Sequence, residues 1–132
     1  MSRSGYVDDD DGEGWMNLYR GNVNRCIGGK RGQAFLREML AALDSMPCKR
    51  LIRGELIESD GACCALGRVA QVRALDVSGV DPDDREQVGG LFNIPPMLAA
   101  EIVFHNDEHF YHASEEDRWS RMREWVESHI KK

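Results

Sequence analysis

Residues 30–46 constrain the fold of this sequence more than any other stretch. Apolar side chains recur there at intervals of three and four residues, and this spacing places them on one face of an α-helix. Pro47 ends the predicted helix, because proline disfavours helical geometry in the residue before it and has no backbone N–H to donate. The stripe must be buried, so the rest of the chain is expected to pack around it. Its members are Phe35, Leu36, Met39, Leu40, Leu43 and Met46.

The length and composition are those of one globular domain. The chain has 132 residues, 42% hydrophobic and 30% charged, which suffices for a single core without disulfides or metals. No apolar run approaches the roughly 18 residues of a membrane span, and no signal-peptide core follows Met1. We therefore expect a cytoplasmic protein with no membrane partner. Four consecutive aspartates in residues 1–13 predict an acidic flexible arm, followed by a single helical domain over residues 14–132.

More helices are expected before and after the central one. A first helix over residues 15–27 ends at Gly28 and Gly29, and this short link makes the two helices an antiparallel or angled pair. Residues 49–66 change period and contain a Ser-Asp-Gly turn signal at 59–61, which predicts a small β-hairpin, with an extended excursion as the alternative. The predicted apolar face of the first helix contains Trp15, Tyr19, Val23, Cys26 and Ile27.

Four helices are predicted in the second half of the chain. They cover residues 66–75, 83–92 and 95–106, with a break near Asn93, and a last helix is capped by Ser114. The fold class is therefore mainly α: a compact single-domain bundle of five to six helices with a small β-hairpin insert. Inward-facing residues of the last helix are predicted to be Trp119, Met122, Val126 and Ile130, with Trp125 at the border.

Charge is distributed unevenly along the sequence. The net charge is −4 over residues 1–14, +6 over 15–53, −8 over 54–113 and zero over 114–132. Such asymmetry predicts a dipolar surface with a basic region around the central helix, although two ordinary solvated faces are an alternative. The basic residues around the joint between the first two predicted helices form the candidate partner- or anion-binding site: Arg20, Arg25, Lys30, Arg31 and Arg37.

Lys30 and Arg31 stand where cations oppose helix stability. Each costs about 0.3–1 kcal/mol when exposed at a helix N-terminus, because it opposes the macrodipole. First-turn amides, neighbouring glycines and several cations together suit a phosphate, a carboxylate or an acidic partner. The stretch is no P-loop, since Arg31 replaces the Ser or Thr that binds magnesium. Plain surface charge remains the alternative.

Residues 86–102 match the packing pattern of a helix-turn-helix, with apolar or small residues at the positions where the two helices meet. The would-be recognition helix offers Pro95, Pro96, Met97, Leu98 and Glu101 instead of the Arg, Lys, Asn or Gln that read DNA. The surrounding acidic charge repels phosphate as well. The pattern thus predicts the shape of the motif more strongly than DNA binding.

Residues 105–112 contain three histidines and Asp107, which are ligand types that suit zinc. The segment lacks a His-Glu-x-x-His frame, so a polar helix end is the favoured interpretation and we predict no metal site and no cofactor. Cysteine spacing gives neither a disulfide frame nor a zinc site, and a cysteine nucleophile lacks a base in register. We therefore expect no enzyme activity and free, mostly buried thiols. The cysteines are Cys26, Cys48, Cys63 and Cys64.

A set of short motifs spans nearly the whole chain, at residues 1–6, 29–36, 43–47, 49–52, 65–67, 106–108 and 118–126. The set resembles a family of short, uncharacterised proteins encoded in proteobacterial genomes and their phages or prophages, and residues 29–36 are its most specific part. This chain departs from the family at Asn93, where glycine is usual, and in the histidine-rich segment after Phe104, which further weakens the metal hypothesis. The family has no assigned activity, so the resemblance implies no catalytic residues.

The resemblance implies a phage-associated accessory role, such as binding a host protein. Together with the dipolar charge, it predicts a non-enzymatic protein that binds a host protein or nucleoprotein, with inhibition of a host defence or regulatory system as one outcome. The alternative is a helix-turn-helix-like regulator that binds nucleic acid, through the basic helix pair or through residues 86–102.

Overall fold

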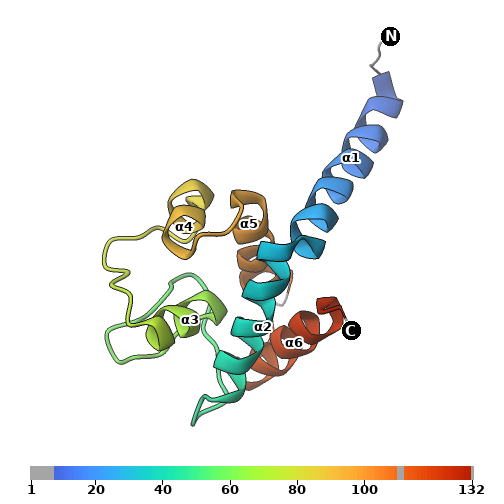
Figure 1. Cartoon of the computed structure of the whole chain (residues 1–132). Coiled ribbons are helices and arrows are strands. Elements are labelled where there is room, and N and C mark those ends of the chain that lie inside the picture. Colours follow the sequence, from blue (N-terminus) through green and yellow to red (C-terminus); the bar gives the residue numbers. More distant parts are fainter. Residues whose placement is uncertain (1–7, 110–111, 132) are drawn as a thin grey trace.

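The chain is mainly α-helical, as predicted (Figure 1). The computed structural model describes residues 8–109 and 112–131, with side chains described for residues 17–108 and 112–131. One π-helical turn, η1 (His105–His109), continues α5. The α-helices are α1 (Asp8–Gly28), α2 (Lys30–Asp44), α3 (Ala65–Arg73), α4 (Arg85–Phe92), α5 (Pro96–Phe104) and α6 (Glu115–His129).

Helix α2 occupies the centre of the molecule, with α3 and α6 packed against it. Five members of the predicted stripe are buried and Leu40 is partly buried. The Phe35 ring meets the Phe92 ring of α4 edge-on, with centroids 5.9 Å apart. One continuous hydrophobic cluster extends from Val23 to Val126, so the central packing role predicted for this helix is confirmed.

Helix α1 begins at Asp8 rather than at Trp15, so residues 8–13 of the predicted arm belong to it, and residues 1–7 lie outside the described residues. Its C-terminal part packs on the core through Val23 and Ile27, whereas the Trp15 side chain is outside the described set. The N-terminal part of the helix extends away from the rest of the molecule (Figure 1).

The β-hairpin predicted over residues 49–66 is wrong. The segment contains no strand, and its one ladder-like pairing is an isolated antiparallel bridge between Ile57 and Cys63. Its backbone is instead bonded in part to distant elements: Leu51 N donates to Glu115 O at 3.1 Å. Within the segment, Glu58 N donates to Ala62 O at 2.7 Å and Cys64 N to Leu56 O at 3.0 Å. The two arms therefore meet only beside the turn, and this pairing is too short to form strands.

A buried pair, Asn106 and Arg118, holds this irregular segment in position. The Asn106 side chain accepts from Ala65 N at 3.1 Å and donates to Ile52 O at 2.9 Å. Arg118, only 3% exposed, donates to Asn106 O at 2.7 Å. Buried polar groups need such partners, so this pair connects the segment to α3, η1 and α6.

The break predicted near Asn93 is confirmed. Asn93 adopts a left-handed conformation (φ 60°) that closes α4, as an asparagine at this position can. Gly89 lets the next turn approach closely, because a Cβ there would lie 2.8 Å from Ile94 O. Among the described residues, no single helix is long and apolar enough to cross a membrane; α4 and residues 96–108 reach that length and composition only as a pair bent by 108°.

The predicted N-terminus of the last helix is confirmed by its cap. Ser114 accepts a hydrogen bond from Asp117 N at 3.0 Å. Met122 and Val126 are fully buried, while Trp119 and Ile130 are partly buried against the core. The inward face of α6 is therefore the one that its spacing predicts.

Candidate functional site

A surface groove lies where α1 ends and α2 begins. Three parts of the chain line it: Asn22, Arg25 and Cys26 of α1, residues 29–32 at the start of α2, and residues 95–97 at the start of α5. The hollow has a volume of about 540 Å³. We call it the basic groove, because Arg25, Lys30 and Arg31 are its charged lining residues.

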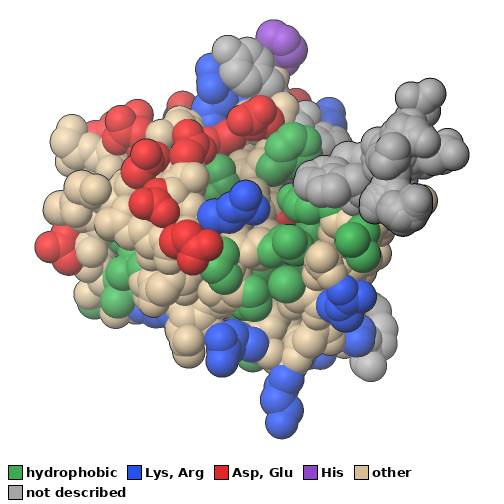
Figure 2. Space-filling model, turned by 90° about the horizontal axis from the view of Figure 1, so that it is seen from above, with side chains coloured by type: hydrophobic (Ala, Val, Ile, Leu, Met, Phe, Trp, Pro, Cys, Tyr) green, Lys and Arg blue, Asp and Glu red, His purple; other side chains and the backbone are tan. Residues whose placement is uncertain are grey.

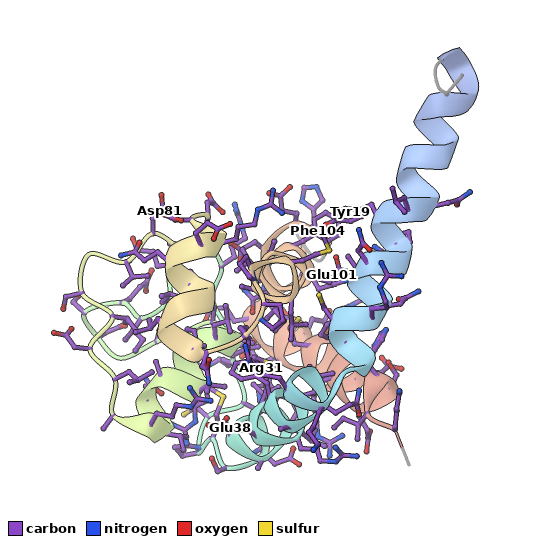
Figure 3. The ribbon with its side chains drawn as sticks, turned by 45° about the horizontal axis from the view of Figure 1, so that its top comes forward. Tyr19, Arg31, Glu38, Asp81, Glu101 and Phe104 are labelled. Atoms are coloured by element: carbon purple, nitrogen blue, oxygen red, sulfur yellow. The ribbon has the colours of Figure 1, made fainter. Side chains whose placement is uncertain are left out.

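The shape of the joint follows from its glycines. Gly29 N bonds to Arg25 O at 2.9 Å, which ends α1, and Gly29 then caps α2 in an extended conformation without a side chain. At Gly32 a Cβ would lie only 2.0 Å from Cys26 O, so any other residue would push the two helices apart. The helices form an angled pair in which α2 leads away from α1 instead of folding back along it (Figures 1 and 3).

Lys30 and Arg31 are exposed, and no described side chain pairs with them. Neither forms a hydrogen bond or an ion pair with any residue whose side chain the structure describes. The first turn of α2 also contains no acidic residue and no side-chain cap. The two charges therefore add to the positive end of the helix dipole without compensation.

A second helix N-terminus faces the same groove. Pro95 caps α5, Pro96 opens it, and both line the groove with Met97. Two positive dipole ends and three cations thus converge on one hollow. The sequence did not predict that residues 95–97 form one wall of the groove, because they are far from the joint along the chain and no local pattern links them to it.

The five candidate residues separate into two groups. Arg25, Lys30 and Arg31 line the groove, and Arg25 also donates to Asn22 Oδ1. Arg20 instead lies 3.4 Å from Glu101 of α5, and Arg37 donates to Lys131 O at 2.8 Å. The latter two therefore hold α1 and the C-terminal end of the chain against the core.

The contact between α1 and α5 contains a buried carboxylate, which α5 contributes. Glu101 is 3% exposed, and its Oε2 lies 2.9 Å from His105 Nε2. Hydrogen bonding with His105 lowers the pKa of Glu101, and the Arg20 charge acts in the same direction while burial opposes both. The His105 ring also lies 4.7 Å from the Trp125 ring of α6. These contacts join α1, α5 and α6; Figure 3 shows Glu101 and Tyr19 at this junction.

The histidine segment gives no metal site in the part of the chain that the structure describes. No three His, Cys, Asp or Glu side chains gather there in a way that could hold a metal ion. His105 is engaged with Glu101, His112 is exposed, and the His109 side chain lies outside the described set. The metal hypothesis therefore gains no support from this segment.

The adjacent cysteines are buried thiols. Burial raises the pKa of Cys63 to about 11 and that of Cys64 to about 12, so both remain protonated and weakly nucleophilic at neutral pH. Cys64 instead caps α3, where its Sγ accepts from Gly67 N at 3.4 Å. The core role predicted for these two cysteines is confirmed, whereas Cys48 is exposed.

Helix α5 is poorly placed to read DNA. Leu98, Ala99 and Ile102 are buried, and α1 packs against the helix. A recognition helix must expose a polar face that enters the major groove. Although α4 and the α5–η1 segment are bent by 108°, which lies in the range of a helix-turn-helix, this geometry gives no reading surface.

Acidic and basic side chains are unevenly distributed over the face seen in Figure 2, with some Lys and Arg side chains beside the acidic ones. Acidic side chains gather over one half of this view, and several Lys and Arg side chains lie along the opposite edge. Exposed acidic residues of the α3–α4 loop include Asp76, Asp81 and Asp83. This separation fits the dipolar charge of the sequence.

Comparison with protein-family models, with curated proteins and with solved structures finds no match for this chain.

Proposed function

We propose that this protein is a small, non-enzymatic interaction protein that binds an acidic surface of another protein in the basic groove. Support comes from one observation above all: Lys30 and Arg31 find no partner among the described side chains, although their position costs helix stability. Charges that do not stabilise the fold are available to bind a partner, because surfaces of opposite electrostatic potential attract and orient two proteins as they associate.

The partner class follows from the chemistry of the groove. Three cations and two helix N-termini favour carboxylates, and the apolar surface of residues 95–97 favours an acidic segment that also presents a hydrophobic residue. With the family resemblance noted above, we place the partner among host proteins or nucleoproteins, and we propose a phage-associated accessory role in which binding inhibits a defence or regulatory system.

Affinity capture from bacterial lysate tests this proposal. The tagged full chain is expected to recover one host protein that survives nuclease treatment and is identified by mass spectrometry. Changing Lys30→Glu together with Arg31→Glu should abolish its recovery. The matched control, Arg50→Glu with Arg85→Glu, reverses the same amount of charge at exposed positions outside the groove and should retain it. Unchanged capture by the groove variant would exclude the basic groove as the binding site.

Nucleic acid is the second candidate partner, because the same cations and helix N-termini suit phosphate. Binding through the groove would then weaken steeply with salt as counterions are released. Material recovered from lysate would be lost on nuclease treatment, and a gel shift would weaken between low and high salt. A shift that salt does not alter would count against this candidate.

A further inference from the structure

One face of α1 is not covered by the rest of the described chain. Leu18 is 64% exposed, and Arg25 is exposed on the same side of the helix, one heptad later. A Cβ at Gly21, between them, would meet only the Arg25 guanidinium, at 3.9 Å. The opposite side packs on the core through Val23 and Ile27. The uncovered side, which we call the Leu18 face, leads directly into the basic groove, because Arg25 belongs to both.

The two ends of α1 have opposite charge. Asp8, Asp9, Asp10, Asp11 and Glu13 occupy its N-terminal part, whereas Arg25 and the two cations that follow the helix occupy its C-terminal end. Asp11 and Arg25 each lie seven residues from Leu18, about 10.5 Å away along the axis in opposite directions. If a second α1 lay antiparallel to this one with the two Leu18 residues opposite each other, the acidic end of each helix would therefore face the basic end of the other.

The acidic end cannot reach the groove of its own chain. Asp8 and Arg25 are separated by about 25 Å along a continuous helix, and the N-terminal part of α1 leads away from the molecule (Figure 1). The acidic end of a second copy has no such restriction.

We infer that α1 pairs antiparallel with α1 of a second copy through the Leu18 face, so that the acidic end of each copy lies on the basic groove of the other. This inference rests on the proposed function, since it names one acidic occupant of the same groove. The interface is isologous, with its two-fold axis near Leu18. Gly14 and Gly21, one heptad apart, permit close approach of the two backbones.

Sedimentation equilibrium of the full chain tests the pairing. We expect a reversible dimer whose dissociation constant rises at least about tenfold between 50 and 500 mM NaCl, because salt screens exposed charges. Leu18→Arg places like charges at the axis and should give a monomer. Val72→Arg, at another exposed apolar position (54%) on α3, should leave the dimer intact. A monomeric wild-type chain at 100 µM, or equal effects of the two variants, would overturn the inference.

A charge-exchange experiment tests the antiparallel arrangement itself. An acidic-end variant carries Asp9→Lys, Asp10→Lys and Asp11→Lys, and a groove variant carries Arg25→Glu, Lys30→Glu and Arg31→Glu. Each alone has two ends of like charge and should be monomeric, whereas an equimolar mixture should form a heterodimer. Circular dichroism of each variant verifies that its helices are retained. A mixture of folded variants that stays monomeric would refute the pairing.

The two proposals fail in different ways. If the wild-type chain is monomeric but Lys30→Glu with Arg31→Glu abolishes host-protein capture, the pairing is wrong and the proposed function stands. In the other outcome, the wild-type chain dimerises and the two charge variants form the expected heterodimer, while Lys30→Glu with Arg31→Glu leaves host-protein capture unchanged. In that case the pairing stands and the host-binding role of the groove is wrong. The acidic-end variant should capture host protein at least as well as wild type, because no second copy competes for its groove.

Discussion

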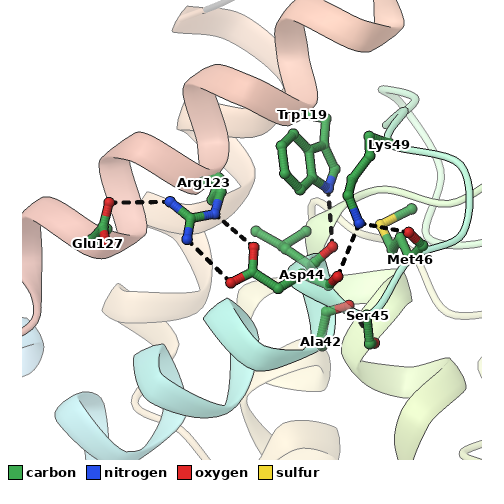
Figure 4. Close-up of polar contacts among 9 residues, drawn as sticks. Ala42, Asp44, Ser45, Met46, Lys49, Trp119, Arg123 and Glu127 are labelled. Carbon is green, nitrogen blue, oxygen red and sulfur yellow. Dashed lines mark hydrogen bonds and ion pairs between the residues drawn. The ribbon is translucent and has the colours of Figure 1, made fainter.

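The two ends of α2 use the same kinds of side chain in opposite ways. At the C-terminal end, cations and other donors meet backbone carbonyls: Lys49 Nζ donates to Met46 O at 2.7 Å, and Trp119 Nε1 to Leu43 O at 3.2 Å. Arg123 binds both oxygens of Asp44, at 2.6 and 3.1 Å (Figure 4). Positive charge at a helix C-terminus stabilises the helix, so each of these contacts serves the fold.

At the N-terminal end, close backbone packing at Gly32 forms the joint, and Lys30 and Arg31 find no partner among the described side chains. Their charge opposes the helix dipole. Since both ends belong to one buried helix, the difference cannot come from the stability of the core. The cations at the C-terminal end hold the fold together, whereas those at the N-terminal end are available for binding. Four measurements test this distinction.

The largest effect is expected at the joint. Gly32→Ala places a Cβ against the Cys26 carbonyl and should lower the free energy of unfolding by about 3 kcal/mol. Gly90→Ala is the matched control, because nothing lies within 4 Å of that position in α4, and it should stabilise the protein by about 0.5–1 kcal/mol. Urea unfolding measures both. Equal effects would show that the joint does not depend on close backbone contact.

Next comes the loss of a cation at the C-terminal end of α2. Arg68 donates to Ala42 O at 3.1 Å and to Ser45 Oγ at 2.9 Å. Arg68→Ala should destabilise the protein by about 1–2 kcal/mol, because Ser45 Oγ loses its donor and Ala42 O loses one of its two side-chain donors. Arg85→Ala, at an exposed position, should change stability by less than about 0.5 kcal/mol. If Arg68→Ala lowered the free energy of unfolding no more than Arg85→Ala does, Arg68 would not be one of the cations that stabilise the fold.

A smaller effect of opposite sign is expected at the N-terminal end. Lys30→Glu with Arg31→Glu replaces two unfavourable charges by favourable ones and should raise the free energy of unfolding by about 1 kcal/mol in total. The same variant should lose its partner, so stability and binding would move in opposite directions. Destabilisation, measured in the same urea titration, would mean that these cations do serve the fold.

The smallest effect concerns pH. Hydrogen bonding from Arg123 lowers the pKa of Asp44 below its ordinary value of 3.8. The pair therefore contributes stability above the pKa of the unfolded chain, and this contribution is lost as the pH falls through the lower pKa of the folded state. Urea unfolding from about pH 5 to pH 2 should show wild type losing about 0.5 kcal/mol relative to Asp44→Asn. Parallel pH profiles would show that the pair contributes nothing.

Local sequence signals predicted the features of the fold that have local causes. The spacing of the α2 stripe, the break at Asn93 and the Ser114 cap each depend on residues within a few positions of one another. The irregular segment over residues 49–64 could not be predicted in this way. Its order depends on Asn106 and on α6, and no periodicity in the segment indicates such distant partners.

The candidate site was predictable to a similar degree. The opposition of Lys30 and Arg31 to the helix dipole is visible in the sequence, and the structure places Arg25 beside them. Sequence position alone grouped Arg20 and Arg37 with these residues, although the structure shows that they contact Glu101 and Lys131. The part of the groove formed by residues 95–97 could not be predicted from the sequence, because α5 reaches the joint only through the packing of the helices.

The cysteines differ in burial, so the rates at which their thiols are labelled report local opening of the protein. Cys48 is exposed, whereas Cys63 and Cys64, at the end of the irregular segment next to α3, are buried. A thiol reagent should modify Cys48 within its ordinary reaction time, but it can reach Cys63 and Cys64 only when this region opens. The slow phase of labelling therefore measures how often the least regular part of the chain leaves its native state, without any engineered probe.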